Sequence, residues 1–281
     1  MADRIAVIGA GQMGNGIAHV FAQSGFDVTM IDVAQAALDR ARDTIAKNLD
    51  RQVKKGSLAE PDKAAILGRV STETSTDAIA GAALVIEAAT ENRDLKFRIF
   101  RELDARADTG AVLATNTSSI SITEIAAQTK RAEQVIGMHF MNPVPVMKLV
   151  EIISGLATSD DTTTRVMAWS TAVGKTPVEV NDFPGFVANR ILMPMINEAV
   201  YCLMEGVGQA EAIDTVMKLG MNHPMGPLAL ADLIGLDTCL AILDVLHEGL
   251  GDSKYRACPL LRKYVAAGWL GRKSGRGFYT Y

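Results

Sequence analysis

The chain has 281 residues, of which 48% are apolar, 21% are charged and only 5% are aromatic. This length suffices for one large domain or two smaller ones, and the apolar fraction excludes an intrinsically disordered or fibrous protein. The formal net charge of −4 gives no global attraction to nucleic acid or to an anionic membrane, so we expect neither as a partner. The three scattered cysteines form no Cys-x-x-Cys pair, which predicts a reducing compartment, no disulfide scaffold and no metal site.

The apolar stretches and the start of the chain indicate where the protein works. No apolar run approaches the roughly 18–20 residues that are needed to cross a bilayer. A strand pattern begins at Arg4, which leaves no room for a signal peptide before it. We therefore expect a soluble, cytoplasmic protein.

Strand and helix patterns alternate over the first two thirds of the chain. Helices are expected over residues 15–24 and 34–55, and the second of these has one apolar stripe opposite a basic face. Short runs of apolar, often β-branched residues predict buried parallel strands. These runs are Arg4–Ile8, Asp27–Ile31, Leu84–Ala88, Val112–Thr115, Val135–Met138 and Lys148–Ile153. Such alternation predicts an α/β fold with a doubly wound, mainly parallel sheet.

The pattern changes near Asp182. Beyond this residue the strand signals end, and helical patterns continue to the end of the chain with glycine-rich interruptions. The expected helices cover about 186–205, 210–219, 228–249 and 259–267. The sequence therefore predicts two domains, an α/β domain over residues 1–183 and an all-helical domain over residues 184–281.

A glycine motif follows the first strand, with Gly9, Gly11 and Gly14 in the spacing Gly-x-Gly-x-x-Gly. Gly9 permits a tight turn, Gly11 lets a pyrophosphate approach the backbone, and Gly14 lets the helix pack closely. The N-terminus of that helix offers N–H groups and the positive end of its dipole to phosphates. The motif, which also contains Gln12 and Met13, predicts a dinucleotide-binding domain of the Rossmann type.

Asp32 lies at the end of the second strand, 23 residues after Gly9. At this position a carboxylate can accept hydrogen bonds from both ribose hydroxyls of an adenosine. Residues 33–36 contain no Arg that could hold a 2′-phosphate, and the carboxylate would repel one. NAD is therefore expected as the cofactor in preference to NADP.

His139 is the candidate acid–base residue. It follows the expected strand over 135–138 and precedes a proline-rich loop, at the edge of the sheet where ligands bind in open α/β folds. A structural loop histidine is the competing interpretation, but Glu151 on the next strand could orient the ring. The segment Asn116–Ser119 closes another strand, either as a helix N-cap or as hydroxyl donors that face the site. The remaining histidines are expected to be structural: His19, His223 and His247.

Seven motifs span the chain and together resemble one family. They are GAGQMG at 9–14, EAATEN at 87–92, NTSS at 116–119, HFMNPVPVMKLVEII at 139–153, DFPGFVANR at 182–190, HPMGPLALADLIGLD at 223–237 and GRKSGRGFY at 271–279. The set resembles the L-3-hydroxyacyl-CoA dehydrogenases, and in particular the short bacterial 3-hydroxybutyryl-CoA dehydrogenases. The long motif that begins at His139 and the motif at 182–190 are the most specific of the seven.

The resemblance implies a role for each matching residue. His139 is implied to be the catalytic base and Glu151 the carboxylate that orients it, with Ser118 and Asn189 at the substrate oxygen. The resemblance further implies that three residues contact the nicotinamide half of NAD, namely Glu91, Lys96 and Asn142. The helix that contains Asn48, Lys54 and Lys55 is implied to meet the coenzyme A part of an acyl-CoA, whose phosphates suit basic side chains.

These roles imply an oxidation of a secondary alcohol, run in reverse on acetoacetyl-CoA. Neutral His139 would remove the hydroxyl proton while hydride leaves the same carbon for the nicotinamide, and Glu151 would stabilise the imidazolium. Asn189 opens the helical domain and His139 closes the sheet, so the site is expected to lie in the cleft between the domains.

Two other functions stay open at this point. One is a related dehydrogenase of a free hydroxyacid or sugar acid, against which the basic face over 47–55 argues. The other is a catalytically idle NAD-binding structural protein, against which the intact set of acid–base and substrate residues argues. The helical domain contains apolar residues, including Met193, Met195, Ile196 and the stretch 228–246, that predict packing against a second copy. A homodimer through this domain is also what the resemblance implies.

Overall fold

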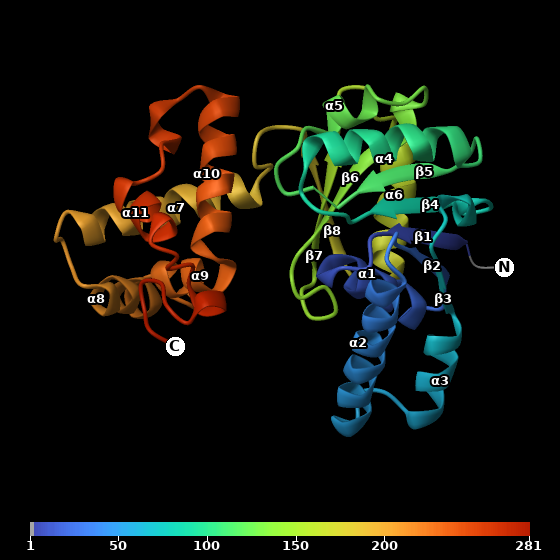
Figure 1. Cartoon of the computed structure of the whole chain (residues 1–281), viewed down its shortest axis with the longest axis horizontal. Helices are drawn as coiled ribbons and strands as arrows, with labels where there is room; N and C mark the ends of the chain where they lie inside the picture. The colour runs from blue at the N-terminus through green and yellow to red at the C-terminus, as the bar shows by residue number, and fades with distance from the viewer. Residues whose placement is uncertain (1–2) are drawn as a thin grey trace. The chain divides into compact units, whose positions relative to one another are not determined.

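The computed structural model describes residues 3–281, which form two compact units, one ending at Asp182 and the other beginning at Phe183. The first unit is built on one eight-stranded sheet (Figure 1). The strands are β1 (Arg4–Ile8), β2 (Asp27–Ile31), β3 (Val70–Glu73), β4 (Leu84–Glu87), β5 (Val112–Thr115), β6 (Val135–Phe140), β7 (Leu149–Ser154) and β8 (Thr176–Asn181).

The strands pair in the order β3-β2-β1-β4-β5-β6-β7-β8. Every pair is parallel except β6 with β7, which is antiparallel. The strand order reverses direction at β1 and β4, so the loops that follow these two strands leave neighbouring points of one sheet edge. Open α/β sheets bind ligands at such a switch point. The structure confirms the predicted doubly wound, mainly parallel sheet.

Helices cover both faces of this sheet. Figure 1 shows α4 and α5 on one face, whereas α1 and α6 pack on the other face in one core with β1. The central strands are buried on both sides, which explains their continuous apolar runs. The helices of the first unit are α1 (Gln12–Gln23), α2 (Gln35–Lys54), α3 (Glu60–Gly68), α4 (Arg93–Arg106), α5 (Ile122–Ala126) and α6 (Asp160–Ala172).

The edge strands β3 and β8 were not predicted, and neither were the bounds of α3, α4, α5 and α6. The strands β3 and β8 lie at the two ends of the sheet, and β8 contains only half-buried and exposed residues. An edge strand has one neighbour and need not be apolar on either face, so β3 and β8 lack the continuous runs of the central strands. The polar helix α3 has one buried residue, Ile66, and so lacks a clear apolar stripe.

The second unit contains helices and no named strand among the residues that the structure describes. Its helices are α7 (Ala188–Met204), α8 (Ala210–Thr215), α9 (Pro227–Ile234), α10 (Leu236–Leu250) and α11 (Pro259–Ala266), and a π-helical turn, Val216–Gly220, follows α8. Gly235, at φ +104°, separates α9 from α10. Nowhere in residues 3–281 is there a helix both long and apolar enough to cross a membrane.

The core of the second unit corrects part of the expected dimer surface. Met193 and Ile196 are fully buried within the unit's own core, as are Leu228 and Leu243. These residues close the unit internally because they fall on the inward stripes of α7, α9 and α10. Within the predicted stretches Leu233 alone is a large apolar residue that is exposed, at 49%. Val216, Leu219 and Met221, which follow α8, form one of the other exposed apolar groups of the unit.

His19 is fully buried on α1, where its Nε2 lies 3.4 Å from the Gln52 amide of α2, and no hydrogen-bond partner reaches its Nδ1 in the described part of the chain. Burial lowers the pKa of His19 to about 4 from the usual 6.5. The unfolded chain therefore binds the proton more tightly than the folded protein between these values. The first unit is expected to lose about 3 kcal/mol of unfolding free energy through this group as the pH falls from 7 to 4.

Urea unfolding of the wild type and of His19→Gln at a series of pH values checks this prediction. The glutamine cannot titrate, so the difference in unfolding free energy between the two proteins isolates the histidine. As the pH falls from 6.5 to 4, the wild type should lose unfolding free energy relative to His19→Gln. A difference that does not change with pH would contradict the assignment.

Candidate active site

The glycine motif forms the turn between β1 and α1. Gly9 has φ +101°, and a Cβ on it would lie 2.7 Å from the carbonyl oxygen of Ala88, which follows β4. A Cβ on Gly14 would lie 1.8 Å from the carbonyl oxygen of Gly9. These two glycines are therefore required by the close packing of the loop, the helix and the neighbouring strand.

Gly11 serves a different purpose from the other two glycines. A Cβ on Gly11 would meet no described protein atom within 4 Å, and Gly11 is the N-cap of α1 with no side-chain cap. A pyrophosphate can therefore approach the backbone at Gly11, next to the first N–H groups of the helix. Gln12, next in the chain, donates from Nε2 to Oδ1 of Asn142 at 3.0 Å, and Met13 packs against the core. These residues fit a dinucleotide.

Asp32 connects the glycine loop to the following helix. Its Oδ2 accepts a hydrogen bond from the backbone N–H of Ala10 at 2.8 Å, and its Oδ1 accepts from Ala34 N–H at 3.0 Å. An ionised carboxylate has further lone pairs on both oxygens, so it can also accept from ribose hydroxyls. Among residues 3–281, no Lys or Arg forms an ion pair with Asp32.

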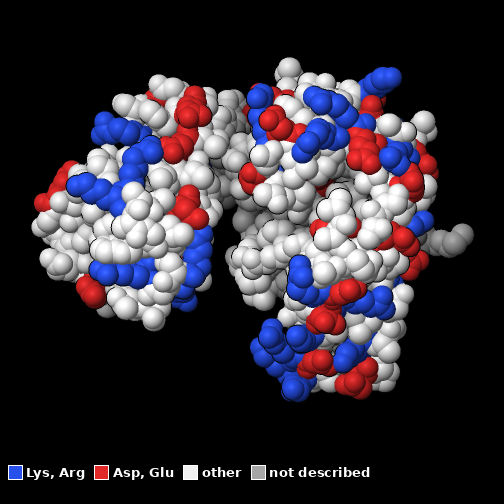
Figure 2. Space-filling view, viewed as in Figure 1, with Lys and Arg blue, Asp and Glu red and all other residues white. Residues whose placement is uncertain are grey.

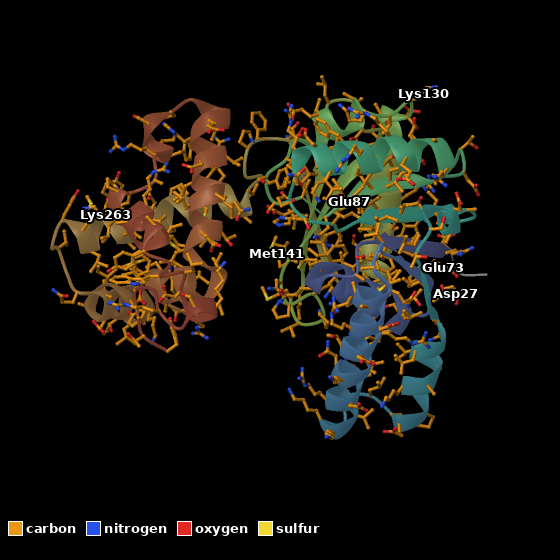
Figure 3. All side chains as sticks on the ribbon, viewed as in Figure 1. Asp27, Glu73, Glu87, Lys130, Met141 and Lys263 are labelled. Carbon is orange, nitrogen blue, oxygen red and sulfur yellow. The ribbon has the colours of Figure 1, made fainter. Side chains whose placement is uncertain are left out.

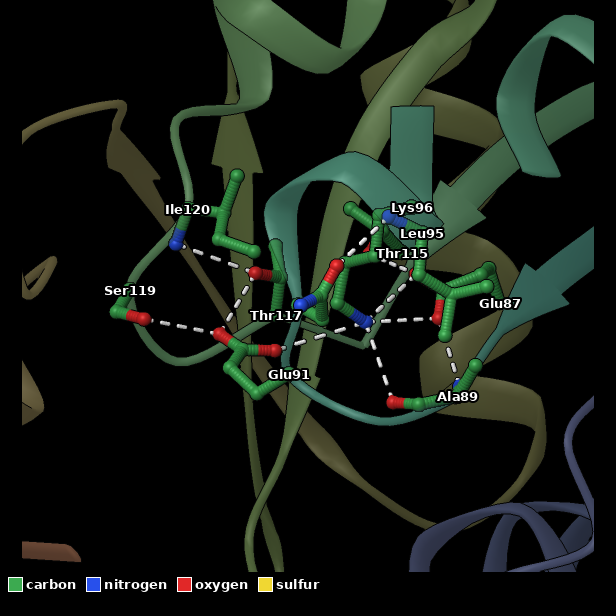
Figure 4. Close-up of polar contacts among 10 residues, drawn as sticks. Glu87, Ala89, Glu91, Leu95, Lys96, Thr115, Thr117, Ser119 and Ile120 are labelled. Carbon is green, nitrogen blue, oxygen red and sulfur yellow. Dashed lines mark hydrogen bonds and ion pairs between the residues drawn. The ribbon is translucent and has the colours of Figure 1, made fainter. Parts of the chain in front are cut away.

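A buried ion pair lies where β4 ends, close to the glycine loop. Glu87 and Lys96 are joined at 2.7 Å, and their side chains are 0% and 1% exposed (Figure 4). Figure 3 shows Glu87 labelled within the first unit. Lys96 was predicted from the family resemblance, but Glu87 was noted only as part of a motif. Thr115, whose hydroxyl donates to Glu87, lies 28 residues away in the chain, and no local pattern signals this hydrogen bond.

Glu91 and the segment after β5 are joined by two hydroxyl groups. Thr117 Oγ1 and Ser119 Oγ donate to Oε1 of Glu91 at 2.8 and 3.0 Å. Ser118 lies between these two residues and is half-buried. The N-cap interpretation of this segment is wrong, because the N-cap of α5 is Ser121, whose hydroxyl accepts from the N–H of Glu124.

The central feature of the site is a hydrogen bond across β6 and β7. The antiparallel register places His139 directly opposite Glu151, which puts both side chains on the same face of the sheet. His139 Nδ1 lies 2.8 Å from Oε2 of Glu151. An ionised carboxylate only accepts hydrogen bonds, so Nδ1 is the donor, and in the neutral ring Nε2 then carries the lone pair. The side chains are 12% and 3% exposed, so the pair is well shielded from water.

The strand end differs from the prediction in one respect. His139 lies inside β6 and does not follow it, because the antiparallel pairs with β7 extend the strand to Phe140. The N–H of Phe140 donates to Oδ1 of Asn116 at 2.9 Å. This contact, which sequence reasoning missed, connects the histidine strand to the segment that contains Ser118.

The loop between β6 and β7 is anchored by a residue that was also missed. Lys175 is nine-tenths buried, and its Nζ donates to the carbonyl oxygens of Val144 and Met147 at 2.5 and 2.8 Å. Burial lowers the pKa of Lys175 from its usual value. The loop contains Asn142 and also Met141, which Figure 3 labels. Lys175 therefore fixes the loop beside the His139–Glu151 pair.

The outer face of α2 is basic, as the sequence predicts. Lys54 and Lys55 are exposed at its C-terminal end, and Figure 2 shows Lys and Arg gathered over the free end of this helix. Asn48 is half-buried, and its Oδ1 accepts a hydrogen bond from Arg51 at 3.1 Å. The inward residues of the stripe, including Leu38 and Ile45, are fully buried.

Asn189 belongs to the second unit. It lies in the first turn of α7 and is 9% exposed, and its backbone N–H donates to the carbonyl oxygen of Gly185. Gly185 has φ +75° and a Cβ on it would lie 2.6 Å from Leu246, which explains the glycine in this motif. The contact of Asn189 with the substrate oxygen remains a prediction.

Both parts of the chain match known families and proteins. Residues 4–183 match the NAD-binding domain of 3-hydroxyacyl-CoA dehydrogenase, and residues 185–281 match the C-terminal domain. A Bacillus subtilis protein named as a probable 3-hydroxybutyryl-CoA dehydrogenase is 60% identical over 99% of this chain and 97% of its own. The 3-hydroxybutyryl-CoA dehydrogenase of Bradyrhizobium diazoefficiens is 57% identical over 99% of this chain and 95% of its own.

A solved structure agrees with these matches. The crystal structure of (S)-3-hydroxybutyryl-CoA dehydrogenase from Ralstonia eutropha has a TM-score of 0.98 and 53% identity, covering 100% of this chain and 99% of that chain. The fold, the glycine loop and the two domain matches all indicate the same family. The chain therefore belongs to the 3-hydroxyacyl-CoA dehydrogenase family and is an oxidoreductase with an NAD-binding domain.

Proposed function

We propose that the protein oxidises (S)-3-hydroxybutyryl-CoA, or a longer 3-hydroxyacyl-CoA, to the 3-oxoacyl-CoA with NAD, and catalyses the reverse reduction of acetoacetyl-CoA. The observation that supports this most strongly is the 2.8 Å contact between His139 and Glu151 in a site with low exposure. The names of the similar proteins supply the substrate class. In this proposal residues 1–183 bind NAD, and residues 184–281 contribute Asn189 and the dimer contact.

The proposed chemistry needs a base for the substrate hydroxyl. When bound, NAD supplies the hydride acceptor at the nicotinamide C4. Nε2 of neutral His139 takes the hydroxyl proton, and the carboxylate of Glu151 stabilises the imidazolium that results. In the reverse direction the imidazolium returns its proton to the ketone oxygen. Ser118 and Asn189 hold that oxygen by hydrogen bonds, which strengthen as negative charge develops on it.

The coenzyme A part of the substrate is assigned to α2. Lys54 and Lys55 are ordinary solvated lysines by themselves, but phosphate groups give an exposed basic face a partner. Charged contacts of this kind bind parts of the substrate that do not react. Binding energy from such remote parts raises kcat/KM for the CoA ester over the free acid.

A turnover assay with NADH separates this function from the two alternatives. Acetoacetyl-CoA should oxidise NADH, and free acetoacetate should do so with kcat/KM lower by at least about 100-fold, since it lacks the remote contacts. Comparable turnover of the free acid would favour a hydroxyacid dehydrogenase. Binding of NADH without turnover of either compound would favour an idle NAD-binding protein.

The protein is expected to favour NADH over NADPH by at least about tenfold in kcat/KM. A 2′-phosphate would meet the Asp32 carboxylate, which costs on the order of 1–3 kcal/mol. Steady-state assays with both cofactors measure this ratio. Asp32→Asn keeps the size of the side chain but removes its charge, so the ratio of kcat/KM with NADH to kcat/KM with NADPH should fall toward one. Equal efficiency of the two cofactors in the wild type would refute this account of Asp32.

We also propose a homodimer formed through the second unit. The exposed side chains of Val216, Leu219 and Met221 are 61%, 82% and 61% accessible, an apolar group that a second copy can cover. Light scattering at micromolar concentration should give twice the 30.0 kDa chain mass. Leu219→Glu should shift the mass toward the monomer, whereas Leu156→Glu, at a similarly exposed leucine of the first unit, should not. A monomeric wild type would remove the proposal.

A further inference from the structure

Every acceptor position of the Glu87 carboxylate is taken by the protein itself. Its Oε1 accepts from Lys96 Nζ and from Ala89 N–H, both at 2.7 Å. Its Oε2 accepts from Lys96 Nζ at 2.9 Å and from Thr115 Oγ1 at 2.6 Å (Figure 4). An ionised carboxylate has about four lone-pair sites, so none remains for a ligand. Glu87 therefore acts on its protein neighbours only.

Lys96 stands between this buried carboxylate and a second, more exposed one. Besides its two contacts with Glu87, its Nζ donates to the carbonyl oxygen of Ala89 at 3.3 Å. It also lies 3.5 Å from Oε2 of Glu91, whose side chain is 37% exposed. One ammonium is thus shared by two carboxylates, and the stronger contacts are with Glu87.

Glu91 in turn holds the segment that contains Ser118. Its other oxygen, Oε1, accepts from the hydroxyls of Thr117 and Ser119. Thr117 Oγ1 also accepts from the N–H of Ile120 at 3.2 Å, which closes the turn. A shift of Glu91 would therefore move the backbone on both sides of Ser118.

We propose that Glu87 is a positioning residue for the nicotinamide end of the site. Its negative charge keeps the ammonium of Lys96 buried beside the end of β4, so that Glu91 stays hydrogen-bonded to Thr117 and Ser119. Without that charge the buried ammonium would be left with Glu91 as its counter-ion and would draw it away from the two hydroxyls. This inference rests on the proposed function, in which Glu91 and Ser118 serve the nicotinamide and the substrate.

Glu87→Gln tests the inference, because glutamine has the size of the native side chain and no charge. Binding is measured with NADH and with ADP-ribose, which lacks the nicotinamide. The Kd of NADH should rise by at least about tenfold, while the Kd of ADP-ribose should change by less than about twofold. A purely structural defect would weaken the binding of both ligands alike. The decisive quantity is therefore the ratio of the Kd of NADH to the Kd of ADP-ribose.

Asp104→Asn is the matched control. It breaks the 2.9 Å ion pair with Arg131 near the far end of α4, so it should lower Tm and leave the ratio unchanged. If Glu87→Gln does not fold, Thr115→Val replaces it. This variant keeps the charge but removes the hydrogen bond that holds Oε2 of Glu87 toward Lys96, so the carboxylate can turn away and the ratio should rise by about threefold.

An unchanged ratio in the folded Glu87 variant, or in Thr115→Val where that variant fails, would overturn the inference alone. A wild type that binds NADH no better than ADP-ribose and does not reduce acetoacetyl-CoA would overturn the proposed function as well. The two failures are therefore distinguishable in one set of measurements.

Discussion

Replacing His139 with glutamine is expected to lower kcat for acetoacetyl-CoA reduction by about 10²–10⁴, the range for loss of a positioned acid–base group. Glutamine has no group that exchanges a proton near neutral pH, so the substrate oxygen would rely on water. Its amide N–H can still donate to Glu151, so the buried carboxylate keeps a partner. The fold and the Kd of NADH should therefore stay close to those of the wild type.

Stopped-flow measurement of NADH oxidation at saturating acetoacetyl-CoA determines this kcat, and fluorescence titration determines the NADH affinity. A variant that binds NADH normally and turns over slowly fits the proposed base. Near-normal turnover would mean that the base lies elsewhere and that the mechanism is wrong.

Glu151→Gln is expected to lower kcat by roughly 10³-fold or more, as when a carboxylate–imidazole pair is forced into the wrong tautomer. The native carboxylate only accepts, which keeps the proton on Nδ1 of His139. An amide can donate to Nδ1 instead, which leaves the proton on Nε2, where the base is needed without one. The amide also lacks the charge that stabilises the imidazolium in a site where Glu151 is 3% exposed.

Glu179→Gln on the adjacent strand β8 serves as the control. Glu179 is exposed and paired in register with Ile152, so its neutralisation should leave kcat unchanged. A Glu151→Gln variant that loses thermal stability but keeps its kcat would show that Glu151 is structural. In that case His139 would have to be oriented by another group.

The sequence predicted those parts of the fold in which one local pattern decides the structure. The strand Arg4–Ile8 and the glycine turn were found because both faces of a central strand must be apolar and because Gly9 needs a positive φ. The edge strands β3 and β8 were missed because burial places no such demand on them. Local pattern also located β6, but only the pairing with β7 carries that strand on to Phe140.

The site was predictable only as far as sequence motifs reach. His139 was expected just after one strand and Glu151 on the next, and the antiparallel register, with His139 inside β6, brings their side chains together. Glu87 and Lys175 had no comparable signal, since their partners are backbone carbonyls or side chains brought near by the topology of the sheet. A charged residue beside an apolar run resembles an ordinary strand end. Its burial becomes apparent only when the flanking helices are in place.

The double-mutant cycle of His139→Gln and Glu151→Gln tests most directly whether the two side chains work as one acid–base unit. The measured quantity is kcat for acetoacetyl-CoA reduction in the wild type, both single variants and the double variant. If Glu151 acts only through His139, the double variant should be little slower than His139→Gln alone. If the two penalties instead multiply in full, Glu151 serves something other than His139 and the proposed pair is wrong.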